Sequence, residues 1–344
     1  MYRDNHIRFA IIAMLFALII FSGCRVAIDT TAFTYEEPLV DPDIKVEKYV
    51  PNKAYNGTTL LADNHRRERP RIIEVDMEGK IIWEYEIPLS LRHYTNPGFD
   101  VEPLPNNHVL FALPGNGIYE IDRAGTVVWS HLDPKVSHDV DRLPNGNTLY
   151  VYGNNDTKAD PQVKEVDASG KIVWSWYANV AFDKSPYKDV YEQGWTHTNA
   201  VTRMANGNTL ISPRNFNCLV EVDPQGNVTR IIGEEYLVHQ HDPEVLPNGT
   251  ILVANHDNPH EILEIDSQTE EIVWRFAILH RRTWPIRDAN RLPNGNTLIT
   301  GTTSLFEITP DKELVWLLEL KNTTFRSPRE APALGFYKAE RITR

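Results

Sequence analysis

Short apolar runs alternate with polar turns along most of the chain. An apolar run follows each of six turns, which contain Asn56, Asn106, Asn145, Asn206, Asn248 and Asn294. A second apolar run then ends in an acidic residue, as in EVD or EID, and a Gly-containing turn leads to a third run that usually carries Trp. Short, alternating, β-branched runs are typical of strands, and Asn-Gly or Ser-Gly pairs between them are typical of hairpins.

The repeat predicts the fold. With the polar segment that precedes each turn, one unit supplies four strands, and repeated four-stranded units of roughly 40–45 residues indicate β-propeller blades. We therefore predict an all-β protein, a six-bladed β-propeller of four-stranded antiparallel blades, over residues 51–325. Residues 326–344 are expected to be a C-terminal tail that completes blade closure.

The first 24 residues have a different pattern. Basic residues precede an apolar run at 9–21, and Ser-Gly-Cys follows it, which is typical of a signal peptide. The run is shorter than the roughly 20 residues of a membrane-spanning helix. FSGC resembles a bacterial lipobox, which implies lipidation of Cys24 and an exported, membrane-anchored lipoprotein of the periplasm or cell surface. An uncleaved anchor and a signal cut elsewhere are alternatives. Residues 25–50 are expected to be a tether that leads into a first strand.

Composition narrows the classes of function. Of 344 residues, 41% are hydrophobic and 24% are charged, which is typical of a globular protein. The formal net charge of −12 argues against a nucleic-acid surface, which needs clustered Lys and Arg. Cys24 and Cys218 are the two cysteines, so the sequence contains no CxxC motif and no Cys/His zinc motif.

Two further features of the repeats have structural interpretations. The recurring Trp is expected to fill the space between neighbouring blades. It occupies positions 83, 129, 174, 274 and 316. The longest interval between turns contains an insertion at 178–195, which we interpret as either an active-site lid or a surface excursion.

Histidines gather at one position of the repeat. His138 and His241 each precede their turn Asn by seven residues, where the sixth repeat has Arg287. His197 and His239 each precede theirs by nine residues. Because the innermost strands of a propeller line its channel, side chains at the start of these strands should converge at one rim.

Arg214 and His256 occupy a second shared position, eight residues after their turn Asn. Imidazoles can bind a metal, although no carboxylate is obviously placed as a further ligand. His and Arg together also suit a tetrahedral oxyanion such as sulfate, since Arg offers a bidentate fork and His can donate a proton or act as a nucleophile. The sequence has neither a Ser nucleophile elbow nor a Gly-rich phosphate loop.

Three segments resemble the bacterial arylsulfate sulfotransferases. They read HDVDRLPNGNTL, WTHTNAVTRMANGNTLISPRNFNCLVEVD and QHDPEVLPNGTILVANHDN, and the resemblance covers most of residues 55–320. It implies a six-bladed propeller that transfers a sulfuryl group from an aryl sulfate to a phenol. The route it implies is ping-pong through a sulfohistidine, with no nucleotide donor and no cofactor or metal.

The resemblance also implies residue roles. His241, in a Gln-His motif, would be the nucleophile, and His138, His197 and Arg214 would complete the catalytic group by holding the sulfuryl oxygens. Asn199 matches the family's Asn beside the second histidine. Either His138 or His197 would protonate the leaving phenolate.

Neighbouring polar residues complete the expected site. Together with Asn199, the substrate-binding group would contain His239, His256 and Arg287. Two other classes of function stay open. One is a non-catalytic propeller that binds an anion or a sulfated glycan, and the other is a propeller polysaccharide lyase or metal-dependent hydrolase.

Overall fold

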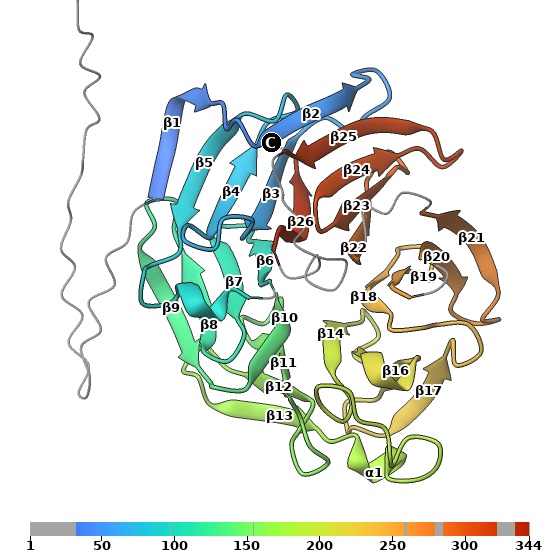
Figure 1. The fold of residues 1–344 in the computed structure, drawn as a ribbon. Coiled ribbons are helices and arrows are strands. Elements are labelled where there is room, and N and C mark those ends of the chain that lie inside the picture. Colours follow the sequence, from blue (N-terminus) through green and yellow to red (C-terminus); the bar gives the residue numbers. More distant parts are fainter. Residues whose placement is uncertain are drawn as a thin grey trace, which may run out of the picture.

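A computed structural model places six antiparallel sheets as blades around a central channel (Figure 1). It describes residues 32–96, 98–153, 155–257, 260–278, 285–321 and 334–343. The predicted six-bladed β-propeller is confirmed. Cys24 and the rest of the expected signal peptide lie outside the described residues. Within the described ranges, no helix is long and apolar enough to span a membrane.

Four blades are built from consecutive strands that run from the channel outward. The second blade contains β6 (Asp100–Pro103), β7 (Val109–Leu113), β8 (Gly117–Ile121) and β9 (Val127–Leu132). The third contains β10 (Val136–Arg142), β11 (Thr148–Tyr152), β12 (Val163–Val166) and β13 (Ile172–Trp176). The fourth contains β14 (Thr198–Arg203), β15 (Thr209–Pro213), β16 (Leu219–Val222) and β17 (Val228–Ile232). The fifth contains β18 (His241–Val245), β19 (Thr250–Asn255), β20 (Glu261–Asp266) and β21 (Ile272–Ala277).

The first and sixth blades have five strands each. The first runs from β26 (Phe336–Ile342) at the channel through β3 (Thr58–Asp63), β4 (Arg71–Val75) and β5 (Ile81–Glu86) to β1 (Ala32–Leu39). The sixth runs from β22 (Ile286–Arg291) through β23 (Thr297–Gly301), β24 (Ser304–Ile308) and β25 (Leu314–Leu320) to β2 (Ile44–Tyr49). In the part of the chain that the structure describes, three short helices lie between strands: η1 (Arg92–Tyr94), α1 (Asn179–Phe182) and η2 (Arg214–Phe216).

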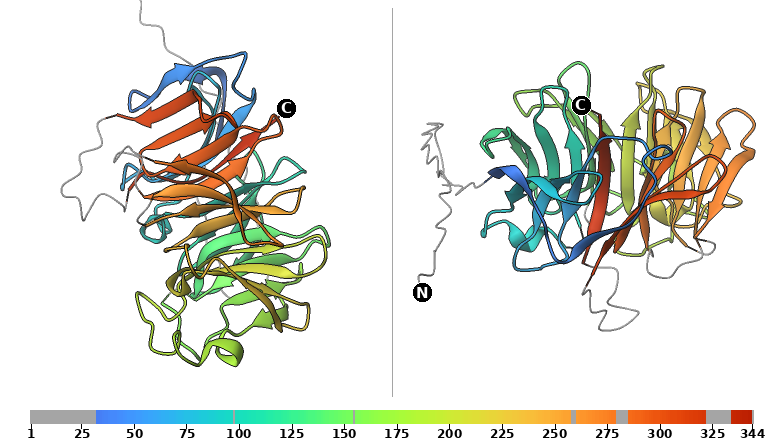
Figure 2. Two further views of the ribbon diagram at one scale, coloured as in Figure 1. Left: turned by 90° about the vertical axis from the view of Figure 1, so that its right-hand side faces the viewer. Right: turned by 90° about the horizontal axis from the view of Figure 1, so that it is seen from above.

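The ring closes through both ends of the described chain. The C-terminal strand β26 pairs with β3 and is the channel strand of the first blade, beside the blue strands in Figures 1 and 2. The segment at 25–50, expected to be a tether leading into a first strand, contains two strands, β1 and β2, which pair with the outer strands β5 and β25. These added strands cover the outer edges of the two blades, which would otherwise expose unpaired backbone groups.

The recurring Trp residues join neighbouring blades, as the sequence predicted. The indole N–H of each donates to a backbone carbonyl in a turn of the adjacent blade, at 2.9–3.1 Å. An arginine guanidinium lies over each indole ring, 4.5–5.3 Å from its centre, in the pairs Arg123–Trp83, Arg142–Trp129, Arg203–Trp174, Arg291–Trp274 and Arg341–Trp316. These contacts are structural because they lie at the seams between blades.

Buried carboxylates also join the blades, at the channel. Asp100 accepts a hydrogen bond from the N–H of Val140 in the next blade (2.9 Å), and Asp139 accepts one from Val201 (2.7 Å). Asp288 accepts from Ala339 at 3.4 Å, across the junction that closes the ring. Each carboxylate therefore satisfies a backbone donor at the edge of the neighbouring channel strand.

Candidate active site

The channel strands are irregular where the predicted site residues lie. In β10 the pairing with β11 slips between Val136 and Val140, and in β18 the pairing with β19 slips between His241 and Glu244. Similar irregularities occur near the start of β14, β22 and β26. Successive side chains of a regular strand point to opposite faces, but a bulge re-aims one of them. Two consecutive residues of one strand, such as His138 and Asp139, can thus both reach the channel.

His138 lies among residues from three other segments. Its ring centre is 4.9 Å from that of His197 and 6.4 Å from that of Tyr337 in β26. The guanidinium of Arg287, from β22, lies 5.1 Å from the centre of the Tyr337 ring. His138 Nδ1 also makes a short hydrogen bond with the hydroxyl of Ser137. Residues of the first, third and sixth blades, with His197 from the start of the fourth, therefore meet at one rim.

His241 is buried, with only 4% of its surface exposed. Its Nδ1 lies 2.9 Å from the backbone oxygen of His239. Because a carbonyl oxygen can only accept a hydrogen bond, Nδ1 carries the proton and Nε2 keeps its lone pair. His256 Nδ1 is 3.1 Å from the same nitrogen and is therefore an acceptor. The ring centres of His241 and His256 are 4.6 Å apart.

Asn199 and Gln240 connect the fourth and fifth blades beside His241. The Asn199 side-chain amide donates to the backbone oxygen of Gln240 at 2.8 Å. The Gln240 side chain, fully buried, donates to the backbone oxygen of Cys218 (2.7 Å) and to Ser212 Oγ (3.1 Å). Gln240 of the Gln-His motif thus holds the backbone in place, while the Asn199 side-chain oxygen is buried without a hydrogen-bond partner.

Arg214 lies at the mouth of the site in a network of charges. Its Nη2 is 3.2 Å from His239 Nδ1 and 3.3 Å from the carboxylate of Glu192. The other Glu192 oxygen lies 3.5 Å from His239 Nε2, and the Asp257 carboxylate lies 2.6 Å from His239 Nδ1. Glu192 belongs to the insertion at 178–195, so the insertion places a carboxylate on the arginine that was predicted to bind an anion.

His197 is held by a buried carboxylate. Asp156 Oδ1 accepts from the backbone N–H of His197 at 3.0 Å, and Asp156 Oδ2 accepts from the N–H and hydroxyl of Thr196 at 3.1 and 2.9 Å. His197 has a φ of +46°, a conformation that side chains other than glycine rarely adopt. These hydrogen bonds anchor the strained backbone on which His197 is presented.

Electrostatics favour neutral imidazoles and an anionic ligand. Burial, the neighbouring histidine and the guanidinium groups of Arg287 and Arg214 hold the pKa of His138 and of His241 well below the usual range. Burial and the two arginines do the same to the pKa of His256. The site therefore combines uncharged imidazoles with two guanidinium groups. In the described ranges, no group of three or more His, Cys, Asp or Glu side chains is arranged to hold a metal ion.

All eight predicted channel residues belong to one connected neighbourhood. Sequence reasoning missed four residues in it: Asp156, Glu192, Tyr337 and Lys338. Counted back from the regular pairing with β11 and β3, Tyr337 and Lys338 occupy in β26 the positions that His138 and Asp139 occupy in β10. Their strand is not followed by a PNGN turn, so alignment on that turn could not find them. Applying the channel-strand pattern to the predicted closing tail would have suggested them.

Comparisons with known proteins identify a sequence family and a fold. The family described as Arylsulfotransferase (ASST) matches residues 43–240, so His241, His256, Arg287 and β26 lie beyond the matched segment. A search of curated proteins finds no match.

Solved structures with low sequence identity share the fold. A protein of unknown function from Bacteroides caccae has 18% identity and a TM-score of 0.59, over 79% of this chain and 96% of that one. A streptogramin B lyase has 13% identity and a TM-score of 0.52, over 88% and 89%. A catalytically inactive virginiamycin B lyase from Staphylococcus aureus, solved with quinupristin, has 12% identity and a TM-score of 0.53, over 84% and 88%.

Proposed function

Because the chain belongs to the arylsulfotransferase (ASST) family, we propose that it transfers a sulfuryl group from an aryl sulfate to a phenol through a covalent intermediate on His241. The observation that carries this proposal is the hydrogen bond from His241 Nδ1 to the backbone oxygen of His239. It leaves the nucleophilic lone pair on Nε2, and the depressed pKa keeps that nitrogen unprotonated at neutral pH.

In the first step, His241 Nε2 attacks the sulfur atom. The N–S bond forms as the bond between sulfur and the phenolic oxygen breaks. The departing phenolate accepts a hydrogen bond from the uncharged imidazole of His138 or His197 and takes its proton from solvent. Arg214 and Arg287 stabilise the negative charge on the sulfuryl oxygens, with Asn199, His239 and His256 as further polar contacts. In the second step, the oxygen of another phenol attacks sulfur and loses its proton to solvent as the N–S bond breaks. The lone pair returns to His241 Nε2, which regenerates the neutral imidazole.

Intact-mass analysis tests this route. Incubation with an aryl sulfate and no acceptor should add one sulfuryl group to the wild-type protein and release one equivalent of phenol. His241→Ala should abolish both, while His108→Ala, in a turn away from the channel, should retain both. A protein that binds the aryl sulfate without releasing phenol would instead be an anion-binding propeller. An adduct that persists in His241→Ala would assign the nucleophile elsewhere.

We also propose that the protein is exported and anchored by a lipid on Cys24. The basic, apolar and FSGC segments of residues 1–24 support this. Labelling bacterial cells that express the chain with a radioactive fatty acid should mark the wild-type protein and not Cys24→Ser. Equal labelling of both would rule out Cys24 as the lipidated residue.

A further inference from the structure

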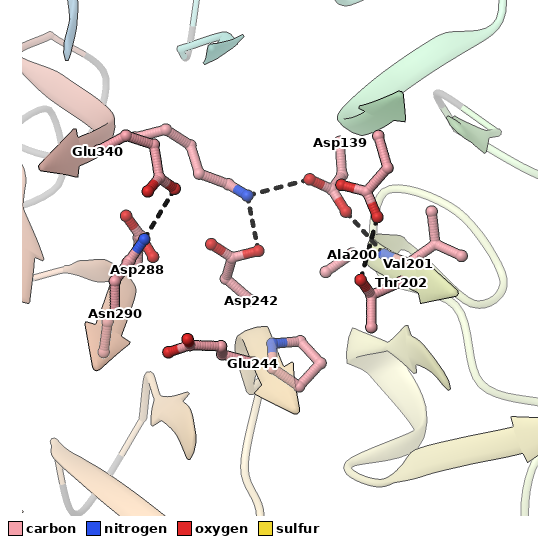
Figure 3. Close-up of a pocket in the computed structure, with 13 residues that line it drawn as sticks. Asp139, Ala200, Val201, Thr202, Asp242, Glu244, Asp288, Asn290 and Glu340 are labelled. Atoms are coloured by element: carbon pink, nitrogen blue, oxygen red, sulfur yellow. Dashed lines mark hydrogen bonds and ion pairs between the residues drawn. The ribbon is translucent and has the colours of Figure 1, made fainter. Parts of the chain in front are cut away.

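Lys338 extends from β26 into the channel and touches carboxylates of three other blades. Its ammonium lies 2.6 Å from Asp242, 3.0 Å from Asp139 and 3.5 Å from Asp100. Only 9% of its side chain is exposed. Figure 3 shows Asp139 and Asp242 turned toward the middle of the channel, each joined by a dashed line to the same ammonium group.

Two of these carboxylates belong to the residues that directly follow the site histidines. Asp139 comes after His138, and Asp242 comes after His241. The second oxygen of Asp139 accepts the N–H of Val201, two residues beyond Asn199. Lys338 itself follows Tyr337, which contacts both His138 and Arg287. The ammonium group of Lys338 therefore binds two residues that adjoin His138 and His241 in the sequence. Lys338 itself adjoins Tyr337, a third residue of the candidate active site.

The backbone at these points departs from regular strand geometry. Asp242 has a φ of +46°, and the strand pairing slips at both His138–Asp139 and His241–Asp242. Such conformations cost free energy and persist only where surrounding contacts hold them. The ion pairs with Lys338 lie at these two bulges, so they act on the segments that set the directions of the two imidazoles.

The charge of Lys338 also offsets repulsion in the channel. Asp100, Asp139 and Asp242 surround it, and a neighbouring cavity of about 160 Å³ is lined by further carboxylates, including Glu244, Asp288 and Glu340. Burial raises the pKa of Asp139 to about 7 although Lys338 lowers it. Without this cation, Asp139 would be protonated at neutral pH or would repel Asp242, and either change would move the two side chains.

We propose that Lys338 is a positioning residue for sulfuryl transfer, whose ion pairs with Asp139 and Asp242 set the orientation of His138 and His241. This proposal rests on the proposed function. It assigns no contact between Lys338 and the substrate. Through these ion pairs, Lys338 fixes the positions of the third and fifth blades relative to the first blade.

The test compares Lys338→Met, which keeps most of the side-chain stem and removes the charge, with Lys164→Met. Lys164 is a matched control because it pairs with Asp133 at 3.1 Å, both side chains are 12% exposed, and the pair lies outside the site. Single-turnover formation of the sulfuryl adduct should slow about 10- to 100-fold in Lys338→Met, as expected for a misplaced reacting group, with a KM for aryl sulfate within a few-fold of wild type. Lys164→Met should react at the wild-type rate.

A second measurement separates positioning from simple loss of folding. Ethylammonium ions should restore part of the rate in Lys338→Ala, measured well below its Tm, whereas ethanol should not. Wild-type rates in Lys338→Met, or a rate loss in it no larger than in Lys164→Met, would overturn the proposal. If the wild-type protein forms no adduct, the proposed function fails, and a crystal structure of Lys338→Met then decides: unchanged His138 and His241 rings would overturn the positioning role as well.

Discussion

Ala200 and Pro243 replace an interacting pair that joins neighbouring channel strands in other blades. Ala200 stands at the position of the aspartate acceptor, and Pro243 stands at the position of the residue whose backbone N–H donates to it. Ala200 stands in β14 where Asp100 and Asp139 stand in β6 and β10, six residues before the turn Asn. Pro243 stands in β18 where Val140 and Val201 donate their N–H groups. Proline has no N–H. The fourth blade, which lacks the acceptor, is therefore followed by the fifth blade, which lacks the donor.

This pairing predicts a strong coupling between the two positions. Pro243→Ala should introduce a buried N–H that has no acceptor, and so lower the free energy of unfolding by about 1–3 kcal/mol. Ala200→Asp alone should also be destabilising, since it buries a carboxylate opposite proline. The double variant should recover stability, and urea unfolding of all four proteins measures the coupling. Additive losses would show that the two positions are independent.

Glu192 should compete with the substrate. Its carboxylate lies on Arg214 and His239, the groups proposed to bind a sulfuryl oxygen, and 54% of its side chain is exposed. An exposed ion pair is worth at most about 1 kcal/mol, so Glu192→Gln should lower KM for an aryl sulfate by up to about fivefold. Asp189→Asn, in the same insertion and 84% exposed, is the control and should leave KM unchanged. A raised KM in Glu192→Gln would mean that Glu192 orients Arg214 instead.

The depressed histidine pKa values predict an unusual pH profile. The rate of adduct formation should be constant around neutral pH and fall only well below pH ~6.5, the ordinary histidine value. Arg287→Met removes a positive charge that disfavours the imidazolium form of His241, so it should move this acid limb to higher pH. Arg275→Met, on the outer strand β21, should not move it. An unmoved limb in Arg287→Met would contradict the electrostatic assignment.

The same pKa shifts affect stability with a defined sign. The unfolded chain takes up protons on these histidines at a higher pH than the folded protein does. The contribution of these histidines to stability should therefore decrease as the pH falls through and below ~6.5, because their protons bind preferentially to the unfolded state. Buried carboxyl groups contribute in the opposite direction, since burial raises the pKa of Glu102 and of Glu340 to about 8.

Asp156 should support activity through His197. In Asp156→Asn, an amide group would face the donors on Thr196 and His197, which should cost about 1–3 kcal/mol of stability and slow sulfuryl transfer. Asp160→Asn is the control, since Asp160 pairs with Lys135 at 2.8 Å on the outside of the same loop region. Lost stability with full activity would show that His197 does not depend on this anchor.

The sequence pattern predicted what recurs along the chain and missed what occurs once. PNGN and Trp recur because each blade has the same folding problem, so blade number and the convergence of His138 with His241 could be inferred. Asp156 lies in the loop between β11 and β12, and Glu192 lies in the insertion at 178–195. Both act through contacts of irregular loops, and no period marks them. β1 pairs with β5 across three intervening strands, and β2 pairs with β25 near the other end of the described chain. Local alternation does not specify such distant partners.

The pairing of β26 with β3 has a consequence for the biogenesis of the protein. Tyr337 and Lys338 reach the channel only when residues 336–342 have been synthesised and have paired with a strand some 280 positions earlier. Contacts between such distant segments form late in folding. A partly synthesised chain can therefore assemble blades while its active site is still incomplete. The active site is completed only when β26 pairs with β3 and closes the ring.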